Sequence, residues 1–192
     1  CSSDLSERIY LNNDWKFAEQ FEASMTEAAY DDSVMQNVRL PHTCKETPLH
    51  YFDEHCYQMV SGYRRVIEAE EAWKGKKILL TIDGAAHDSE VFLNGDKVGE
   101  HHCGYTAFTM DISGVLRYGE KNILVVKVDS REDLNIPPFG YVIDYMTYGG
   151  IYRDVYLDIK NKDHIEDIFI RTDIGQMDDQ NAELISEVTD RK

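Results

Sequence analysis

The segment from Gly140 to Val155 concentrates side chains that could hold a ligand. One carboxylate, Asp144, lies among Tyr141, Tyr145 and Tyr148, directly before a pair of glycines. A carboxylate accepts hydrogen bonds from hydroxyl groups, and phenol rings offer flat apolar faces for stacking. Acids in turns also cap backbone N–H groups, and tyrosine rings often fill a core or a seam between domains, so each residue also has a structural interpretation.

The chain around Asp144 is predicted to form a long ordered loop. Residues 131–150 contain the adjacent prolines Pro137 and Pro138 and three glycines, and their side chains follow neither the period of a strand nor that of a helix. Long loops inside compact domains often carry function, which favours a binding role for this one. Phe139, directly after the prolines, is expected to anchor the loop by packing.

Short runs rich in Val, Ile, Tyr and Phe alternate with turn residues, and no segment has the pattern of a capped amphipathic helix. In a strand at residues 151–159, Arg153 shares a face with Ile151 and Val155, so it is expected to point inward, pair with a buried acid and hold a loop. We therefore predict an all-β chain, with its clearest strands at residues 63–69, 77–83, 89–93, 97–102, 107–112, 122–129 and 151–159.

Other signals are more local. Asn94 and Gly95 tolerate the positive φ angles of a type I′ turn and predict a tight hairpin. Residues 14–17 and 38–43 are expected to add two strands, and residues 25–30 are compatible with a helix.

Repeated strands without helical crossovers predict a jelly-roll β-sandwich for residues 1–160. Residues 161–192 predict two further strands, at 164–172 and 182–189. A tail of about 30 residues cannot bury a core alone, so it is either the start of a second β domain or an addition to the edge of the first.

Charge and hydropathy exclude several function classes. The 192 residues are 42% hydrophobic, enough for a packed core, and 36 acidic against 20 basic side chains give a formal charge of −16. Because this charge repels polyanions, no nucleic acid and no acidic membrane surface is expected as a partner. No apolar run approaches the ~20 residues of a membrane span, so no membrane span is expected. The first residues also lack the apolar h-region of a secretory signal peptide.

The four cysteines, Cys1, Cys44, Cys56 and Cys103, form neither a CxxC pair nor a dense disulfide pattern. Free thiols are therefore expected, which favours the cytoplasm. The chain opens on Cys1 rather than Met, which is also compatible with a lipidated mature terminus of a periplasmic protein or lipoprotein, or with a boundary introduced by cloning.

His101, His102 and Cys103, together with His87 and Asp88, form the cluster that most suggests a metal. Its spacing matches no zinc signature, and metal sites need three or four converging ligands, so we predict no metal and no cofactor in this chain. The sequence also contains no catalytic triad pattern, phosphate-binding loop or Cys–His pair, and we assign it no catalytic residue.

Several short segments follow one another in a characteristic order: Leu40-Pro41-His42-Thr43, Gly62-Tyr63-Arg64-Arg65, the run from Ile82 to Gly95, Gly99, the run from Gly104 to Ile112, Gly119-Glu120-Lys121-Asn122, and Gly149-Gly150-Ile151-Tyr152-Arg153-Asp154-Val155. This series, over about residues 8–160, resembles the N-terminal sugar-binding domain of family-two glycoside hydrolases. The family includes β-galactosidases, β-glucuronidases and β-mannosidases, and the last segment is most similar to the β-galactosidase branch.

The resemblance implies a galactose-binding-type jelly roll, then an immunoglobulin-like sandwich, then a TIM barrel whose two glutamates act as acid/base and nucleophile. The tail from His164 then fits the first strands of the immunoglobulin-like domain. Retaining hydrolysis needs two carboxylates about 5 Å apart, and the resemblance places both in the barrel, so this chain alone is expected to be inactive. A divalent or monovalent cation and a homo-oligomer would belong to the full enzyme.

The resemblance also assigns a role to Asp144, because the family's β-galactosidases present an aspartate to sugar hydroxyl groups from the loop before the matching strand. Tyr141, Tyr145 and Tyr148 would wall the same site.

The family's second sugar-contacting residue, an asparagine ahead of the strand at Gly62, has no clear equivalent, and Asp53, Glu54 and His55 occupy that space. The leading hypothesis is the sugar-binding scaffold of a retaining, exo-acting, β-galactosidase-like hydrolase. The alternatives are a stand-alone carbohydrate-binding module, with or without structural calcium, and an adhesion or assembly sandwich that uses its unpaired edges.

Overall fold

The computed structural model describes residues 6–47, 49–50, 53, 55–139, 147–164, 167–172 and 184–189. Their regular structure consists of strands and short 3₁₀ helices, in agreement with the all-β prediction, and none of these helices is long and apolar enough to cross a bilayer. The elements are β1 (Glu7–Tyr10), β2 (Trp15–Ala18), η1 (Ala23–Thr26), η2 (Asp32–Val34), β3 (Gln36–Val38), β4 (Val60–Glu68), η3 (Glu71–Trp73), β5 (Lys77–Ile82), β6 (Ala85–Ala86), β7 (Asp88–Leu93), β8 (Asp96–His102), β9 (Phe108–Asp111), β10 (Lys121–Asp129), β11 (Gly150–Ile151), β12 (Val155–Lys160), β13 (Asp167–Thr172) and β14 (Leu184–Thr189).

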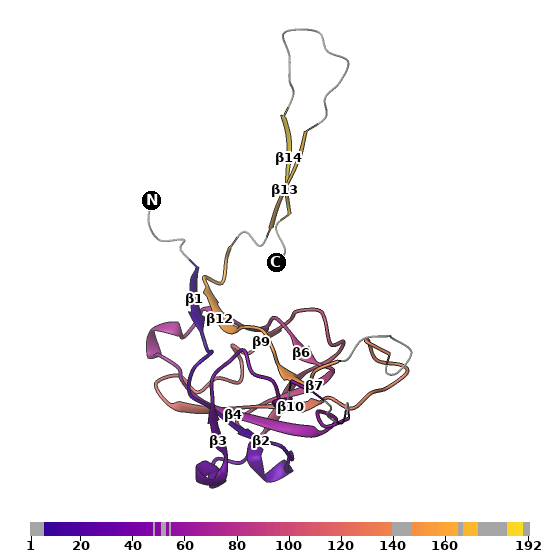
Figure 1. The fold of residues 1–192 in the computed structure, drawn as a ribbon. Coiled ribbons are helices and arrows are strands. Elements are labelled where there is room, and N and C mark those ends of the chain that lie inside the picture. Colours follow the sequence, from indigo (N-terminus) through magenta and orange to yellow (C-terminus); the bar gives the residue numbers. More distant parts are fainter. Residues whose placement is uncertain are drawn as a thin grey trace.

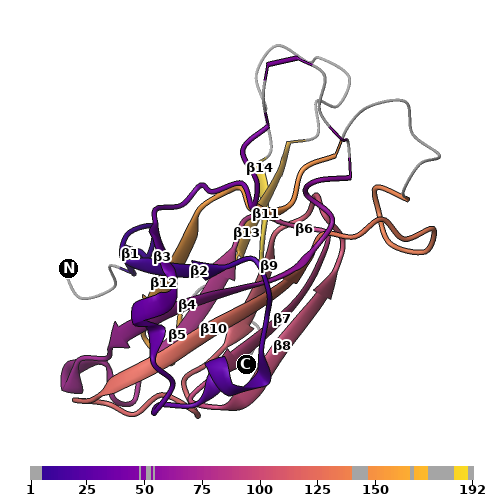
Figure 2. The ribbon, with the colours of Figure 1, turned by 60° about the horizontal axis from the view of Figure 1, so that its bottom comes forward.

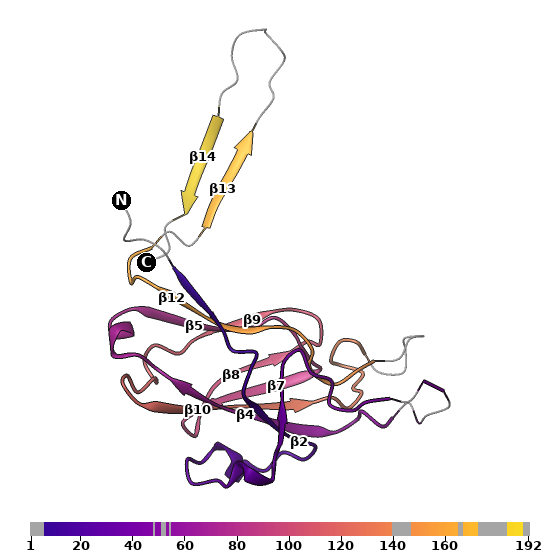
Figure 3. The same cartoon turned by 60° about the vertical axis from the view of Figure 1, so that its left-hand side comes forward.

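Two antiparallel sheets form the body of the structure. One has four strands in the order β1-β12-β5-β9, and the other has six in the order β3-β2-β4-β10-β7-β8. Figures 1 and 3 show these sheets as two layers facing one another, the arrangement of a β-sandwich. Strands distant in sequence pair within each layer, such as β1 with β12 and β4 with β10, so the predicted jelly-roll class is confirmed.

The hydrophobic core fills the space between the layers. Alternate side chains of β5, β10 and β12 point into it, and Val126 and Leu157 have no exposed surface. On β12 the buried residues alternate with the half-buried Tyr156 and Asp158, so the predicted strand with one wet side is confirmed over Val155–Lys160.

The predicted strand at residues 151–159 is wrong as a single element. β11 ends at Ile151 and pairs with β6, whereas β12 begins at Val155 and pairs with β5. The residues between them bend the chain from one partner strand to another, so the alternation expected for Arg153 does not apply. The other clear predictions, at 63–69, 77–83, 89–93, 97–102, 107–112 and 122–129, correspond to β4, β5, β7, β8, β9 and β10.

The N-terminal third differs most from its predictions. Only Val38 of the predicted strand at 38–43 belongs to β3, and the backbone N–H of His42 instead donates to the carbonyl oxygen of Ile151, at 2.8 Å. The helix considered at 25–30 is the shorter 3₁₀ turn η1. β1 was not foreseen, because a four-residue edge strand has too short a pattern and is stabilised by pairing with β12.

The predicted Asn94-Gly95 hairpin is confirmed. Asn94 and Gly95 have φ angles of 54° and 96°, and Leu93 pairs with Asp96 across the turn that joins β7 and β8. The side-chain oxygen of Asn94 also accepts a hydrogen bond from the N–H of Ile123, at 3.0 Å, which ties the turn to β10.

The two strands predicted in the tail correspond to β13 and β14, which pair as an antiparallel hairpin. Figures 1 and 3 show this hairpin extending away from the two sheets. Its assignment to an immunoglobulin-like domain, and the boundary between residues 160 and 161, stay predictions.

Candidate functional site

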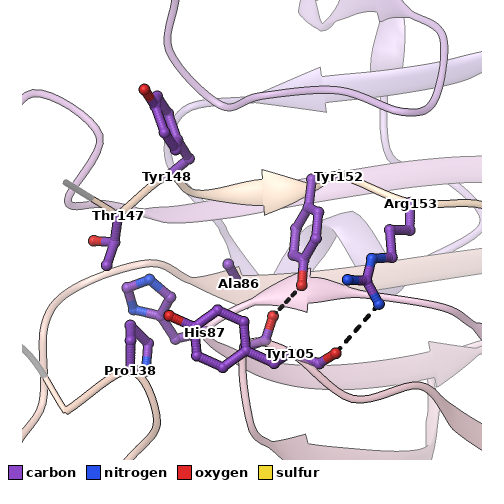
Figure 4. Close-up of a pocket in the computed structure, with 9 residues that line it drawn as sticks. Ala86, His87, Tyr105, Pro138, Thr147, Tyr148, Tyr152 and Arg153 are labelled. Carbon is purple, nitrogen blue, oxygen red and sulfur yellow. Dashed lines mark hydrogen bonds between the residues drawn. The ribbon is translucent and has the colours of Figure 1, made fainter. Parts of the chain in front are cut away.

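Of the four predicted sugar-contacting residues, Tyr148 alone falls within the described part of the chain. Asp144, Tyr141 and Tyr145 lie outside it, so their role stays a prediction. Tyr148 is 54% exposed, and in Figure 4 its ring points away from His87. Tyr148 lies in the predicted loop, and its exposed ring is accessible to a ligand.

The glycine pair that follows this loop is explained by close backbone packing at one end of the sandwich, where β6 and β11 lie (Figure 2). The N–H of Cys44 donates to the carbonyl oxygen of Gly149, at 3.0 Å. Gly150 has a φ of 107°, and a Cβ atom there would lie 2.7 Å from both the His42 carbonyl oxygen and the Tyr63 hydroxyl oxygen. No other residue fits without displacing this segment.

A chain of hydroxyl groups fixes Thr147, two residues before the glycine pair. Thr147, which is 6% exposed, donates to the Tyr57 hydroxyl oxygen at 2.5 Å, and Tyr57 donates to Oε1 of Glu132 at 2.8 Å. Burial raises the pKa of Tyr57, so the phenol stays protonated and keeps its donor role. The end of the predicted loop is therefore held in place by the sandwich.

A surface pocket of about 240 Å³ lies beside this anchored segment (Figure 4). Three stretches of chain line it, and Pro138 closes one side. The stretches contribute Ala86 with His87, Gly104 with Tyr105, and the segment around β11 with Thr147, Tyr148, Tyr152 and Arg153.

His87 is the most buried titratable group in the pocket wall, with 3% of its surface exposed. Its backbone N–H donates to the carbonyl oxygen of Asp129 at 2.9 Å, and its Nδ1 lies 3.4 Å from the carbonyl oxygen of Arg131. Burial lowers the pKa of His87, so the ring is neutral near pH 7. Within the described ranges, Nε2 has no hydrogen-bond partner.

Tyr152 and Arg153 hold the opposite wall. The Tyr152 hydroxyl donates to the carbonyl oxygen of Gly104, and Arg153 Nη1 donates to the carbonyl oxygen of Tyr105 at 3.3 Å (Figure 4). Arg153 is exposed, so the prediction that it points inward and pairs with a buried acid is wrong. It bonds main-chain carbonyls because it lies in the bend between β11 and β12, and in this way it does hold a loop.

Two further expectations concern Phe139 and the residues at 53–55. Phe139 was expected to pack as an anchor, but its N–H closes a turn onto Ile136 and the ring is 47% exposed, so that prediction is wrong. Asp53 bonds the backbone and the ring of His55 within an exposed turn, and neither residue lines the pocket. Glu54 lies outside the described residues, and whether any of these three residues takes the place of the family's asparagine stays a prediction.

The His and Cys cluster weighed as a metal site is divided among other contacts. His102 Nδ1 lies 2.6 Å from Asp88 Oδ1, and His101 stacks on Phe108 with 4.4 Å between ring centroids. Across the ranges that the structure describes, no three His, Cys, Asp or Glu side chains converge as metal ligands. Sequence reasoning weighed His87 only as part of this cluster, and the one hint of its pocket role is its position in a short turn after two small residues, Ala85 and Ala86.

Fold and site together define a jelly-roll domain with a pocket at one end of its sandwich, and comparisons with known proteins give its family. The family model for the glycosyl hydrolases family 2 sugar-binding domain matches residues 8–161. The chain belongs to this family, as the sugar-binding domain found in β-galactosidase- and β-glucuronidase-type glycoside hydrolases.

Comparisons with individual proteins support this family assignment. The chain is 41% identical to a β-galactosidase of Thermoanaerobacter pseudethanolicus over 92% of its own length, and 34% identical to a β-glucuronidase of Bacteroides fragilis over 80%. A solved calcium-binding mutant of Bacteroides uniformis β-glucuronidase 2 matches 96% of the chain with 31% identity and a TM-score of 0.82. The chain spans 24%, 21% and 22% of these proteins, so it is similar to one part of each.

Proposed function

We propose that this chain is the N-terminal, non-catalytic part of a retaining exo-glycoside hydrolase that acts on β-galactosides. In this role the sandwich supports a TIM barrel that follows in the same protein, and its loop provides Asp144 to hydroxyl groups of the sugar. The observation that carries the proposal is the anchored segment at Thr147, Gly149 and Gly150, which fixes the exit of that loop.

The choice of a galactoside rests on the relatives. Proteins described as β-galactosidases are 41% and 42% identical to this chain over 92% and 85% of its length, whereas the β-glucuronidase of Bacteroides fragilis is 34% identical. The rest of the proposed enzyme supplies the carboxylate pair that retaining hydrolysis requires about 5 Å apart. We expect the isolated chain to hydrolyse nothing. A cation and a homo-oligomer stay predictions for the longer protein.

We propose the cytoplasm as the compartment, because the described cysteines Cys44, Cys56 and Cys103 are all free thiols. Cys1 lies outside the described residues.

The experiment is a comparison of Asp144→Asn with Asp133→Asn in the longer enzyme, assayed on β-galactosides and β-glucuronides. Losing a charge-assisted hydrogen bond to substrate should lower kcat/KM for galactosides by about 10- to 100-fold. Asp133 is exposed in the same loop and caps the N–H of Asn135 at 2.6 Å, so Asp133→Asn should leave kcat/KM unchanged. If Asp144→Asn lowers the melting temperature and leaves kcat/KM intact, the acid is structural.

The pocket at His87 favours a second candidate, a carbohydrate-binding module that works without a barrel. That candidate requires tight sugar binding by the isolated chain. A half-site that depends on a second domain would instead bind weakly, because it lacks the converging contacts that close a pocket. Calorimetric titration of the isolated chain with galactosides and oligosaccharides separates the two.

A further inference from the structure

The Asn94-Gly95 pair is a sequence motif that the proposed function does not use, and it is chemically labile. Glycine has no Cβ atom to hinder its backbone nitrogen from approaching the side-chain amide carbon of a preceding asparagine. The chain contains this dipeptide once, and Gly95 lies on the exposed side of the turn between β7 and β8. The turn is therefore a candidate site of chemical modification, through loss of the Asn94 amide nitrogen.

The reaction at this turn requires only water as its co-reactant. The backbone nitrogen of Gly95 loses its proton to hydroxide and attacks Cγ of Asn94. The bond from Cγ to Nδ2 then breaks, and ammonia leaves with a proton from water, which regenerates the hydroxide. Water opens the resulting succinimide ring. Its attack on Cγ gives aspartate, and its attack on the main-chain carbonyl carbon gives isoaspartate, which adds a methylene group to the backbone.

The folded structure opposes this reaction because it holds both ends of the Asn94 amide. Nδ2 donates to Oδ1 of Asn122 at 2.8 Å and to the carbonyl oxygen of Val115 at 3.4 Å. Oδ1 accepts from the backbone N–H of Ile123 at 3.0 Å. Attack by Gly95 makes the planar Cγ tetrahedral and expels Nδ2, so these hydrogen bonds must break before the ring can close.

Asn122, the main partner of that amide, is itself fixed in place. It has no exposed surface, and its Nδ2 donates to the carbonyl oxygens of Arg117 and Glu120, at 2.9 Å and 3.1 Å. Its Oδ1 also accepts from the backbone N–H of Arg117, at 2.8 Å. Asn122 therefore cannot follow the Asn94 side chain toward Gly95, and the turn must separate from β10 before the amide can react.

We propose that Asn94 is a deamidation site that folding protects, and that it reacts only when the β7–β8 hairpin opens away from β10. The position of β8 at the end of the six-stranded sheet favours such local opening. The proposal does not depend on the proposed function.

Both products oppose the return to the native turn. Aspartate places an acceptor oxygen where Nδ2 had donated, against Asn122 Oδ1 and the carbonyl oxygen of Val115. Isoaspartate lengthens a turn in which Leu93 pairs directly with Asp96. Modified molecules are therefore expected to keep a weakened hairpin.

The test incubates the 192-residue chain at mildly alkaline pH, folded in buffer and unfolded in urea. Peptide mapping by mass spectrometry follows the mass gained when an amide NH₂ becomes OH. In urea Asn94 should convert faster than any other asparagine. In buffer its conversion should be slower by at least about tenfold, because the reactive open form is a minor population. Equal rates in the folded and unfolded chain would overturn the proposal.

Two substitutions separate protection of the amide from the effect of its loss. Asn122→Ala removes the acceptor of Asn94 Nδ2 and should speed conversion in the folded chain by about tenfold, as expected for a lost buried hydrogen bond. Asn94→Asp reproduces one product and should lower the folding equilibrium constant by about tenfold or more.

Asn37, which is exposed on β3, provides the matched controls. Asn37→Ala should leave the conversion rate at Asn94 unchanged, and Asn37→Asp adds the same charge with little effect on folding. The proposal is wrong if Asn122→Ala and Asn37→Ala convert alike, or if Asn94→Asp folds as stably as Asn37→Asp. If Asn122→Ala fails to fold, the incubation and the two aspartate variants still decide. None of these readouts measures hydrolysis, so the Asp144 experiment stands apart from them.

Discussion

Thr147 donates a hydrogen bond to the phenol oxygen of Tyr57, and the two oxygen atoms lie 2.5 Å apart. Both side chains are buried, and Tyr57 continues the chain to Glu132 at 2.8 Å. Tyr57 thus joins Glu132 and Thr147, which lie near the two ends of the 131–150 segment that carries Asp144. The bond couples the stability of the sandwich to the placement of the candidate site.

Tyr57→Phe should therefore lower the free energy of unfolding by about 1–3 kcal/mol, because the buried Thr147 hydroxyl loses its acceptor. Urea denaturation of the isolated chain measures this. Tyr148→Phe is the control: its hydroxyl belongs to a side chain 54% exposed, so its removal should change stability by less than about 0.5 kcal/mol. Equal effects of the two variants would mean that the Tyr57 bond contributes nothing.

Gly150→Ala should destabilise the fold strongly, by about 3 kcal/mol or more, because it combines an unfavourable φ with overlap against backbone. The new Cβ atom would approach the His42 carbonyl oxygen to 2.7 Å and the Cys44 nitrogen to 2.9 Å, and neither can move without breaking the pairing to the β11 segment. In the longer enzyme the same variant should lower kcat/KM, since the loop exit shifts.

Gly114→Ala provides the comparison for that variant. A Cβ atom at Gly114 meets nothing within 4 Å and the residue has no positive φ, so the change should be neutral or slightly stabilising through the unfolded chain. Melting temperatures of the two variants, recorded side by side, check the prediction. It is wrong if both shift the melting temperature alike.

Arg64 and Asp32 form the most buried ion pair among the residues described, with 2.6 Å between Nη1 and Oδ2 and an Arg64 side chain 3% exposed. Arg64 also donates to the carbonyl oxygens of Met25 and Glu27, at 3.1 Å each. Asp32→Asn removes the negative charge from a desolvated guanidinium group. Because Asp32 is itself 30% exposed, the expected loss is about 1–3 kcal/mol rather than the larger cost of a fully buried pair.

The exposed pair Arg8–Asp158 is the reference, with 46% of the Arg8 side chain accessible. Asp158→Asn should cost less than about 1 kcal/mol, and added salt should reduce that cost further. Chemical denaturation at low and high salt distinguishes the two pairs. An Asp32→Asn effect as small and as salt-sensitive as that of Asp158→Asn would contradict the argument.

The parts of the fold that follow from local physics could be predicted from the sequence. The alternation of buried and half-buried residues in β12 reflects a pleated strand with one buried face, and Asn94-Gly95 meets a steric demand that few other pairs satisfy. The ordered series of motifs then identified the family without any coordinates.

The remaining features depend on contacts between distant segments. The bend at Tyr152 and Arg153 exists because β11 pairs with β6 while β12 pairs with β5. No local sequence pattern predicts that consecutive strands pair with different partner strands. His87 becomes a candidate ligand contact only when Arg131, Thr147 and Pro138 are brought around it. From the sequence, His87 was grouped with a possible metal-binding cluster, because residue spacing alone does not show which distant residues pack against a turn.

The pH dependence of stability follows from imidazole rings that folding keeps neutral. Burial lowers the pKa values of His87 and His42 below 6.5. Between the folded pKa and 6.5 the unfolded chain binds more protons, so these rings contribute stability that is fully present above about pH 7 and is lost as the pH falls through their folded pKa values. His102 has the opposite sign, since its hydrogen bond to Asp88 raises its pKa and stabilises the fold at acidic pH.

The free energy of unfolding should therefore fall between about pH 7 and pH 5, by at most about 1.4 kcal/mol per pH unit for each proton taken up. Carboxylates such as Glu90, whose pKa is lowered from 4.5 by hydrogen bonds from Lys127 and Lys97, respond mainly below this window. Urea unfolding at stepped pH measures the slope. His87→Phe should flatten it and His102→Gln should steepen it, because the first removes a ring that resists protonation and the second removes one that favours it. An unchanged slope in His87→Phe would mean that the ring is protonated as readily in the folded protein as in the unfolded chain.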